Sequence, residues 1–307
     1  MPRPPSRGQS KSADRPLPIF PLLLVALLLA LVIYAVWVRL KLAKRPSETA
    51  EGPRSAAGSV LEPDRVIYGG EPRAQKSDAR LNVMVLKNKA YTVGYSEMRR
   101  DPLWSAYHVV KREPPFVLPR PKGEFLTDTR VPRPVTHHDY TDSGFDRGHM
   151  TPNSVIAKCF GAEAQRETFL MTNICPQAPN LNREVWEKLE KDEIDWGWRF
   201  GEVWVMDGPI FPDVMDPSKG VKKLKSGVSL PEAFYKIVIR DPSGGRGVGL
   251  EVLAVIMPQD VKGTELPAQF TRRIRDIEER TGLEFLWKLP EGQRRQLEMM
   301  AHPLWGN

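Results

Sequence analysis

Apolar positions in the second part of the chain fall into short runs that are bounded by turn-forming residues. Six runs rich in β-branched and aromatic residues have this form: 81–86, 90–95, 104–110, 203–207, 233–240 and 249–257. Such runs are typical of β-strands in half-buried or buried sheets. Three of them follow one another closely before residue 111, so we expect neighbouring strands there to pair antiparallel.

Longer segments between and after these runs contain good helix formers. They cover 162–169, 183–200 and 267–280. In the middle segment, a broad apolar side is expected to pack on a core; it comprises Val185, Trp186, Leu189 and Trp196. Strands grouped before intervening helices predict an α+β fold with a mainly antiparallel central sheet flanked by helices.

The first part of the chain has a different pattern. Residues 17–38 contain no charged side chain and are dominated by Leu, Val, Ile and Ala. At about 1.5 Å per residue, a helix of this length crosses a hydrocarbon core of about 30 Å, so we predict one transmembrane helix before the folded domain. A cleaved signal peptide is the alternative. Its apolar region normally has about 7–15 residues and ends at small residues, whereas this one ends at Val36-Trp37-Val38.

The predicted organisation is a disordered basic tail at 1–16, a transmembrane anchor at 17–38, a flexible linker at 39–62 and a folded domain at 63–307. The charge distribution follows this division. Residues 1–45 hold eight Lys/Arg and one Asp, a surplus equal to the formal net charge of +7 of the whole chain. The rest of the chain is therefore neutral in sum, and any nucleic-acid contact on the folded domain must be a local patch.

Three segments of the folded domain carry residues suited to phosphodiester hydrolysis. They are Asp146-Arg147-Gly148-His149, Asn173-Ile174-Cys175-Pro176-Gln177, and the stretch from Leu181 to Glu190. A histidine with a pKa near neutrality can take a proton from water. A hard divalent cation held by oxygen ligands can neutralise charge on a phosphate and on the leaving oxygen.

These segments resemble the DNA/RNA non-specific endonuclease family of the ββα-metal (His-Me finger) superfamily. That family carries Asp-Arg-Gly-His, Asn-x-x-Pro-Gln and Leu-Asn-x-x-x-Trp-x-x-Leu-Glu, and all three are present here in this order. The resemblance implies that His149 is the general base and that Asn182 is the only direct protein ligand of one Mg²⁺, with Mn²⁺ as a substitute. It also implies that Glu190 positions a metal-bound water and that Arg147 supports the phosphate.

Helix geometry agrees with different roles for Asn182 and Glu190. Eight residues of α-helix rise about 12 Å and turn about 80° beyond two revolutions, so both side chains should not ligate one ion directly. Each residue also has a structural interpretation, Asn182 as a helix N-cap and Glu190 as part of a solvated Glu/Lys face. We expect Asn173 to hold a loop through side-chain hydrogen bonds.

Two further features are compatible with other chemistry. His137-His138-Asp139 could belong to a zinc site, but adjacent ligands rarely satisfy tetrahedral geometry without a partner elsewhere. We therefore expect a loop that leads into the active-site strand. The two cysteines, Cys159 and Cys175, leave a disulfide open, and buried free thiols are the preferred interpretation.

The sequence thus predicts a metal-dependent, sugar-non-specific endonuclease that hydrolyses phosphodiester bonds in DNA and RNA. The alternative is a catalytically inactive nucleic-acid-binding or uptake module derived from a nuclease, which the retained His149, Asn182 and Glu190 disfavour. The expected partners are DNA and RNA without sequence preference and the membrane through the N-terminal anchor. A second copy of the chain, in a homodimer, is left open.

The location of the domain is not decided by charge, because four basic residues lie on each side of residues 17–38. An active nuclease that faced the cytosol would endanger the nucleic acids of its own host. We therefore expect a single-pass membrane protein with the catalytic domain outside the cytoplasm, on the periplasmic side or in the mitochondrial intermembrane space.

Overall fold

The computed structural model describes residues 66–122, 125–244 and 246–306, all of which belong to one compact unit. The predicted tail, anchor and linker at 1–16, 17–38 and 39–62 lie outside the described residues. Within the described ranges, no helix is both long enough and apolar enough to cross a membrane.

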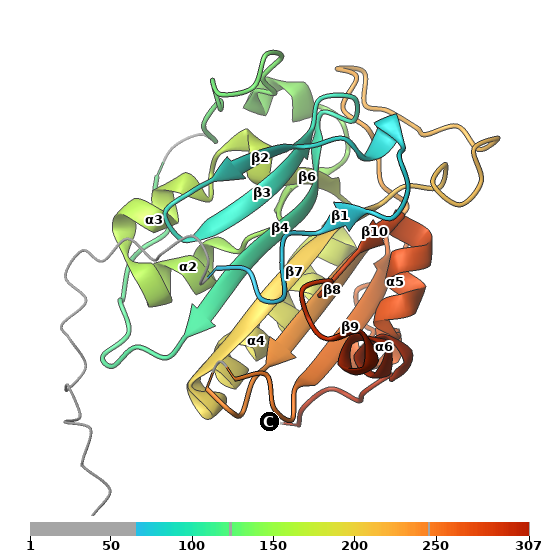
Figure 1. The fold of residues 1–307 in the computed structure, drawn as a ribbon. Helices are drawn as coiled ribbons and strands as arrows, with labels where there is room; N and C mark the ends of the chain where they lie inside the picture. The colour runs from blue at the N-terminus through green and yellow to red at the C-terminus, as the bar shows by residue number, and fades with distance from the viewer. Residues whose placement is uncertain (1–65, 123–124, 245, 307) are drawn as a thin grey trace, which may run out of the picture. The chain divides into compact units, whose positions relative to one another are not determined.

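The centre of the fold is an antiparallel sheet of six strands (Figure 1). From one edge to the other, the strands are β2 (Met84–Lys87), β3 (Tyr91–Ser96), β4 (Asp101–Val110), β7 (Glu202–Ile210), β8 (Ala233–Arg240) and β9 (Glu251–Pro258). All six predicted strands are present, and the predicted α+β class with a mainly antiparallel sheet is confirmed. The first predicted run begins instead with a short 3-10 helix, η2 (Ala79–Leu81).

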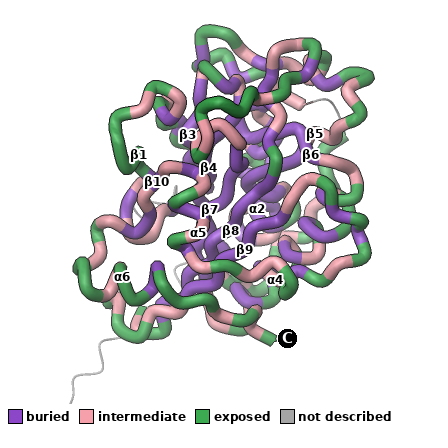
Figure 2. Tube along the Cα trace, turned by 90° about the vertical axis from the view of Figure 1, so that its right-hand side faces the viewer, coloured by how far each residue is buried: buried purple, intermediate pink, exposed green. Residues whose placement is uncertain are grey.

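Both faces of this sheet are buried, which explains why its strands have few polar residues. In β7, Val203 and Val205 pack into one hydrophobic cluster, whereas Trp204 and Met206 pack into a second cluster on the opposite face. Successive side chains of a strand point to opposite faces, so each strand contributes to both clusters. Figure 2 shows the buried strands between the helices of the two sides.

Helices cover the two faces separately (Figure 1). On one face lie α2 (Asn153–Phe160), α3 (Ala162–Glu167) and α4 (Glu187–Phe200). On the other lie α5 (Ile274–Thr281) and α6 (Glu291–Met299). The remaining elements are β1 (Arg73–Ala74), β10 (Leu283–Glu284), η3 (His137–Tyr140), β5 (Asp146–His149), η4 (Met171–Asn173), β6 (Ile174–Gln177), a π-helix η5 (Leu181–Trp186) and η6 (Pro267–Phe270).

The helices differ from the prediction in four places. The segment 267–280 is divided into η6 and α5, because Thr271 between them forms a β-bridge with Val255. The segment 183–200 begins as the π-helix η5 before it continues as α4. Helices α2 and α6 were not predicted, since each is short and carries several polar residues.

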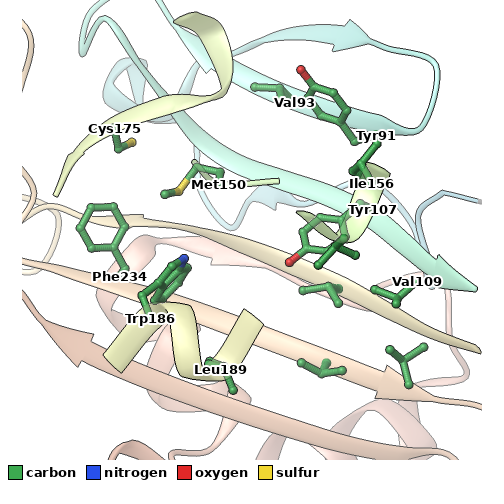
Figure 3. Packing of buried hydrophobic residues seen from close by; sticks show 14 of the residues in the cluster. Tyr91, Val93, Tyr107, Val109, Met150, Ile156, Cys175, Trp186, Leu189 and Phe234 are labelled. Atoms are coloured by element: carbon green, nitrogen blue, oxygen red, sulfur yellow. The ribbon is translucent and has the colours of Figure 1, made fainter. Parts of the chain in front are cut away.

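The core face that α4 covers contains a buried ionic cluster as well as apolar side chains. Lys236 of β8 is fully buried, and its Nζ lies 2.5 Å from Glu193 Oε1 and 3.2 Å from Asp207 Oδ2. The same ammonium donates a hydrogen bond to the Tyr107 hydroxyl at 3.0 Å. Trp186 packs beside it, with its ring 5.8 Å from that of Phe234 (Figure 3). Such a cluster is stable only while each charge keeps its partner.

We predict that Lys236→Met lowers the free energy of unfolding by about 3–5 kcal/mol at pH 8, since removing one partner leaves buried carboxylates uncompensated. Burial already raises the pKa of Asp207 to about 8. When a carboxyl has a higher pKa in the folded state than in the unfolded state, the protein becomes less stable as pH rises. The loss of unfolding free energy in Lys236→Met should therefore be smaller at pH 5 than at pH 8. Urea unfolding at both pH values measures it. Lys219→Met, at an exposed position, is the control, and an equal effect of both variants would contradict the prediction.

Candidate active site

The Asp-Arg-Gly-His segment forms strand β5, which pairs antiparallel with β6 of the Asn-x-x-Pro-Gln segment. His149 lies opposite Ile174, Gly148 opposite Cys175 and Asp146 opposite Gln177. Two of the three predicted segments thus form one two-stranded ribbon. Strand β5 is the active-site strand that was expected after the 137–139 loop, whereas β6 was not predicted, because it has only four residues and no apolar alternation.

Asn173 fixes the end of this ribbon, as predicted. Its Nδ2 donates hydrogen bonds to the carbonyl oxygens of Thr151 at 3.0 Å and Thr168 at 2.9 Å. Its Oδ1 accepts a hydrogen bond from the Thr151 amide at 2.9 Å. The side chain is fully buried, so it replaces backbone pairing where β5 ends and holds the chain that follows His149.

Gly148 is required by the close approach of Gln177. A Cβ atom at position 148 would lie 1.9 Å from Gln177 Oε1, a separation that no pair of non-bonded heavy atoms tolerates. The Gln177 side chain is fully buried over the glycine, and neither of its polar atoms has a hydrogen-bond partner among the described residues. The packing of Gln177 on Gly148 therefore links the two sequence motifs directly.

His149 points into an apolar and cationic environment. Its ring lies 5.4 Å from that of Phe125 and meets Phe169 edge-on at 5.3 Å. Its Nε2 is buried and has no partner in the part of the chain that the structure describes. Burial, followed by the nearby charge of Arg120, lowers the pKa of His149 to about 3. The imidazole is therefore neutral at physiological pH and has a nitrogen that can accept a proton.

Two arginines lie near this histidine, and they differ in their hydrogen bonds and ring contacts. Arg147 donates hydrogen bonds from Nε and an Nη atom to the His137 carbonyl, at 3.2 and 2.6 Å. Its predicted contact with phosphate therefore stays a prediction. Arg120 was not singled out from the sequence, although its guanidinium lies 5.3 Å from the Phe169 ring centroid and acts on His149. Its neighbours Pro119 and Pro121 give no local signal of this role.

Asn182 lies in the π-helix η5 and is held by Asp146 of the ribbon. Its Nδ2 donates to Asp146 Oδ2 at 3.0 Å, while Arg183 binds the same carboxylate through two nitrogens. Burial favours protonation of this carboxyl, but the hydrogen bonds from Arg183 and Asn182 outweigh it and keep the pKa of Asp146 below its usual value. With its nitrogen engaged, Asn182 presents the amide oxygen, which is the atom suited to a hard cation.

The π-helix changes the helical geometry that the sequence predicted. Its wider turn takes up about one extra residue. From Asn182 to Glu190 the chain then makes about seven α-helical steps, or about 700°, which is about 20° short of two turns rather than about 80° beyond them. The two side chains therefore project toward nearly the same side of the helix, and Glu190 is half-buried rather than part of a solvated face.

Glu190 belongs to a region where buried carboxylates outnumber buried cations. Burial raises the pKa of Glu190 to about 8; the charge of Lys236 lowers it again in part, and Glu193 and Asp207 raise it further. Lys236 is the one fully buried cation among the described residues. This surplus of acid and the Asn182 amide oxygen fit a divalent cation that completes its coordination with water.

The other predicted candidates do not form sites. Among the described residues, no group of three His, Cys, Asp or Glu side chains could hold a metal ion. The His137-His138 pair instead belongs to η3, just before β5. Cys159 and Cys175 are both buried and free, as the preferred interpretation stated, and burial raises the pKa of the Cys159 thiol to about 12.

Comparison with known proteins identifies the class that this fold and ribbon define. A family model described as DNA/RNA non-specific endonuclease matches residues 69–292, more than half of the chain. The chain therefore belongs to the DNA/RNA non-specific endonuclease family, and it is an endonuclease. The resemblance found in its three motifs is confirmed.

Two mitochondrial nucleases and one solved structure illustrate the likeness. Nuclease 1, mitochondrial, of Schizosaccharomyces pombe is 30% identical over 230 residues, 68% of this chain and 68% of the relative. Endonuclease G, mitochondrial, of Bos taurus is 30% identical over 247 residues, 76% of this chain and 80% of the relative. A chain of the crystal structure of the EndoG/EndoGI complex shares the fold with a TM-score of 0.63 at 23% identity, covering 78% of this chain and 96% of that one.

These relatives correct the predicted localisation. We expected a single-pass membrane protein with its catalytic domain outside the cytoplasm, on the assumption that residues 17–38 form an anchor. The matched relatives are named as mitochondrial nucleases, and the described part of the chain contains no membrane-spanning helix. These findings contradict the predicted single-pass localisation, and they do not show the membrane or a second copy of the chain as a partner.

We predict that Gly148→Ala lowers the free energy of unfolding by about 1–3 kcal/mol, because the new methyl group overlaps Gln177. The double variant Gly148→Ala/Gln177→Ala should be more stable than Gly148→Ala, since shortening Gln177 removes the overlap. Urea unfolding of the wild type, both single variants and the double variant measures the coupling energy. Additive effects of the two substitutions would show that Gly148 is needed for another reason.

Proposed function

We propose that this endonuclease hydrolyses phosphodiester bonds in DNA and RNA with a divalent cation, His149 acting as the general base. The observation that carries the proposal is the link between β5 and η5 through Asp146. Strand β5 ends in the neutral imidazole, and the same strand begins with the carboxylate that orients the Asn182 amide. A base for water and an oxygen ligand for a cation are therefore held by one short rigid element.

His149 would take a proton from the water that attacks phosphorus. A base with a pKa of about 3 is too weak for this at neutral pH, because an efficient general base has a pKa near the working pH. A bound phosphate would change that. Its negative charge would pair with Arg120, removing a cation that disfavours the imidazolium, and would itself favour a proton on His149. The histidine would thus become a competent base only with substrate present.

Asn182 would hold the cation through Oδ1, and Glu190 would bind a water of its coordination shell. When bound, Mg²⁺ or Mn²⁺ would neutralise charge on the phosphate and the departing oxygen. The half-buried Glu190 carboxyl, whose pKa is about 8, would ionise more readily beside such a cation. Asp146 would keep the amide of Asn182 in the orientation that presents oxygen.

Low sequence preference follows from the groups that line the site. Arg120, Arg147, His149 and Asn182 are suited to phosphate, water or a cation, and contacts to the sugar-phosphate backbone carry no direct base information. The chain after residue 45 is neutral in sum, so the folded domain carries no overall surplus of basic residues. Binding should therefore depend on a few local cations.

We predict that His149→Ala reduces cleavage of single-stranded DNA and of RNA by about 10²–10⁴-fold, the usual loss on removal of a general base. Nicking and gel assays with purified full-length protein in Mg²⁺ measure the rates, and DNA binding should persist. His302→Ala, in the C-terminal segment, is the matched control and should cleave normally. A His149→Ala protein that cleaves at the wild-type rate would refute the assignment. A wild type that binds but never cleaves would favour the inactive binding module.

We predict that chelation abolishes cleavage and that Mg²⁺ or Mn²⁺ restores it. Asn182→Ala should raise the metal concentration for half-maximal activity more than Glu190→Gln does, since a direct ligand contributes more to affinity than a residue acting through water. Calorimetric titration with Mn²⁺ provides a readout without turnover. Asn82→Ala, at an exposed position, is the control. Stronger loss of metal affinity in Glu190→Gln than in Asn182→Ala would reverse the assigned roles.

A further inference from the structure

A cavity of about 560 Å³ opens beside the proposed active site, where residues 118–122 and Leu126 face helix α3. Leu118, Pro119 and Leu126 form apolar walls, and Lys122 and Arg166 bring two cations to the same cavity. Phe169 completes the lining. Its volume falls within the range of about 300–1,000 Å³ that is typical of small-molecule sites.

The cavity is held open by specific contacts. Buried Gln165 of α3 donates a hydrogen bond from Nε2 to the Pro119 carbonyl at 3.2 Å, which fixes the near wall. Leu126 donates from its amide to the Phe169 carbonyl and accepts from the Met171 amide, both at 2.8 Å. Pro119 and Leu126 are thus both attached to the core, and the prolines at 119 and 121 restrict the backbone on either side of Arg120.

One residue separates this cavity from His149. Phe169 lines the cavity and also meets the His149 ring edge-on at 5.3 Å. Arg120 lies over the same phenyl ring at 5.3 Å from its centroid. A molecule in the cavity would therefore lie next to a phosphate bound at His149, with only the Phe169 ring between the cavity and the imidazole.

The chemistry of the lining identifies the class of occupant. Lys122 and Arg166 are both exposed at this cavity, so an anion that enters it can pair with their charges. A nucleotide combines an apolar planar base with a phosphate anion, and the cavity combines apolar walls with two cations. Apolar contact with the base and charge pairing with the phosphate are the interactions by which proteins bind single strands without reading sequence.

We propose that this cavity receives one unstacked nucleotide next to the scissile phosphate, with its base against the apolar wall and its phosphate at Lys122 and Arg166. This inference rests on the proposed function. A base can enter the cavity only after it leaves the helical stack, which is easiest in a strand that is already single. The cavity therefore favours single-stranded segments of the substrate over regular duplex.

The test uses full-length protein with Lys122→Glu or Arg166→Glu, and Lys76→Glu as the control. Lys76 is exposed between β1 and η2, and its substitution makes the same charge change. Each protein is assayed in Mg²⁺ on a single-stranded oligonucleotide, on the matching duplex, and on bis(p-nitrophenyl) phosphate, which is a phosphodiester without a nucleotide. Oligonucleotide binding is measured at several salt concentrations, and thermal melting verifies folding.

Both cavity variants should lose about 10-fold in kcat/KM on the oligonucleotide, and their binding should lose about one unit of salt slope, as when one phosphate contact is removed. Hydrolysis of bis(p-nitrophenyl) phosphate should stay unchanged, and the preference for single strand over duplex should fall. Lys76→Glu should match the wild type throughout.

Three results would overturn the inference. If the cavity variants match Lys76→Glu on the oligonucleotide while all proteins hydrolyse bis(p-nitrophenyl) phosphate, the cavity does not bind substrate and the proposed function stands. Equal losses on both substrates would show a general effect on the site rather than a nucleotide subsite. A wild type that cleaves no substrate in Mg²⁺ would refute the proposed function, and this inference with it.

Discussion

The pairing of β5 with β6 is the constraint on which the rest of the site depends. Four residues of β5 have too little surface to hold a position alone, so the strand is fixed by its partner, by the side chain of Asn173 and by the packing of Gln177 on Gly148. The ribbon then determines two positions at once. The last residue of β5 is His149, so the ribbon fixes the position of its imidazole. The first residue of β5 is Asp146, which orients the Asn182 side chain on a separate helix. A shift of β5 would therefore displace His149 and Asn182 together, the residues that we propose as general base and cation ligand.

Burial gives these groups their chemical character. Without substrate, His149 is neutral because burial and Arg120 lower its pKa, and Glu190 holds a proton more readily because burial raises its own. A phosphate would stabilise positive charge on the histidine, and a cation would stabilise negative charge on the glutamate. In the proposed mechanism, both groups would thus reach their working protonation states only when phosphate and cation are bound. In the core beneath α4, the buried carboxyls of Glu193 and Asp207 likewise depend on a partner charge, which Lys236 supplies.

The sequence predicted the six-stranded sheet well, because long apolar runs bounded by turns are a strong signal. It also singled out His149, Asn182 and Glu190, since their motif is specific. It could not predict the ribbon, whose strands depend on the tertiary contacts of Asn173 and Gln177 rather than on periodicity. The π-helix at Asn182 has no local signature, and Arg120 acquires its role only when its proline-rich segment packs over Phe169. The predicted localisation was contradicted, because it combined the hydropathy of 17–38 with a general argument about nuclease toxicity, and neither depends on the residues of the folded site.

The central claim is that one ribbon brings His149 and Asn182 to the same phosphate. A crystal structure of the His149→Ala protein with Mn²⁺ and a short single-stranded oligonucleotide is the strongest test. Anomalous scattering from Mn²⁺ locates the metal without any assumption about which residues bind it. We expect one anomalous peak at about 2.0–2.2 Å from Asn182 Oδ1, the distance typical of a small octahedral cation. A phosphate oxygen should share that metal, and the phosphorus should face the space left by the imidazole. A metal bound away from Asn182, or a phosphate on the far side of β5, would contradict it.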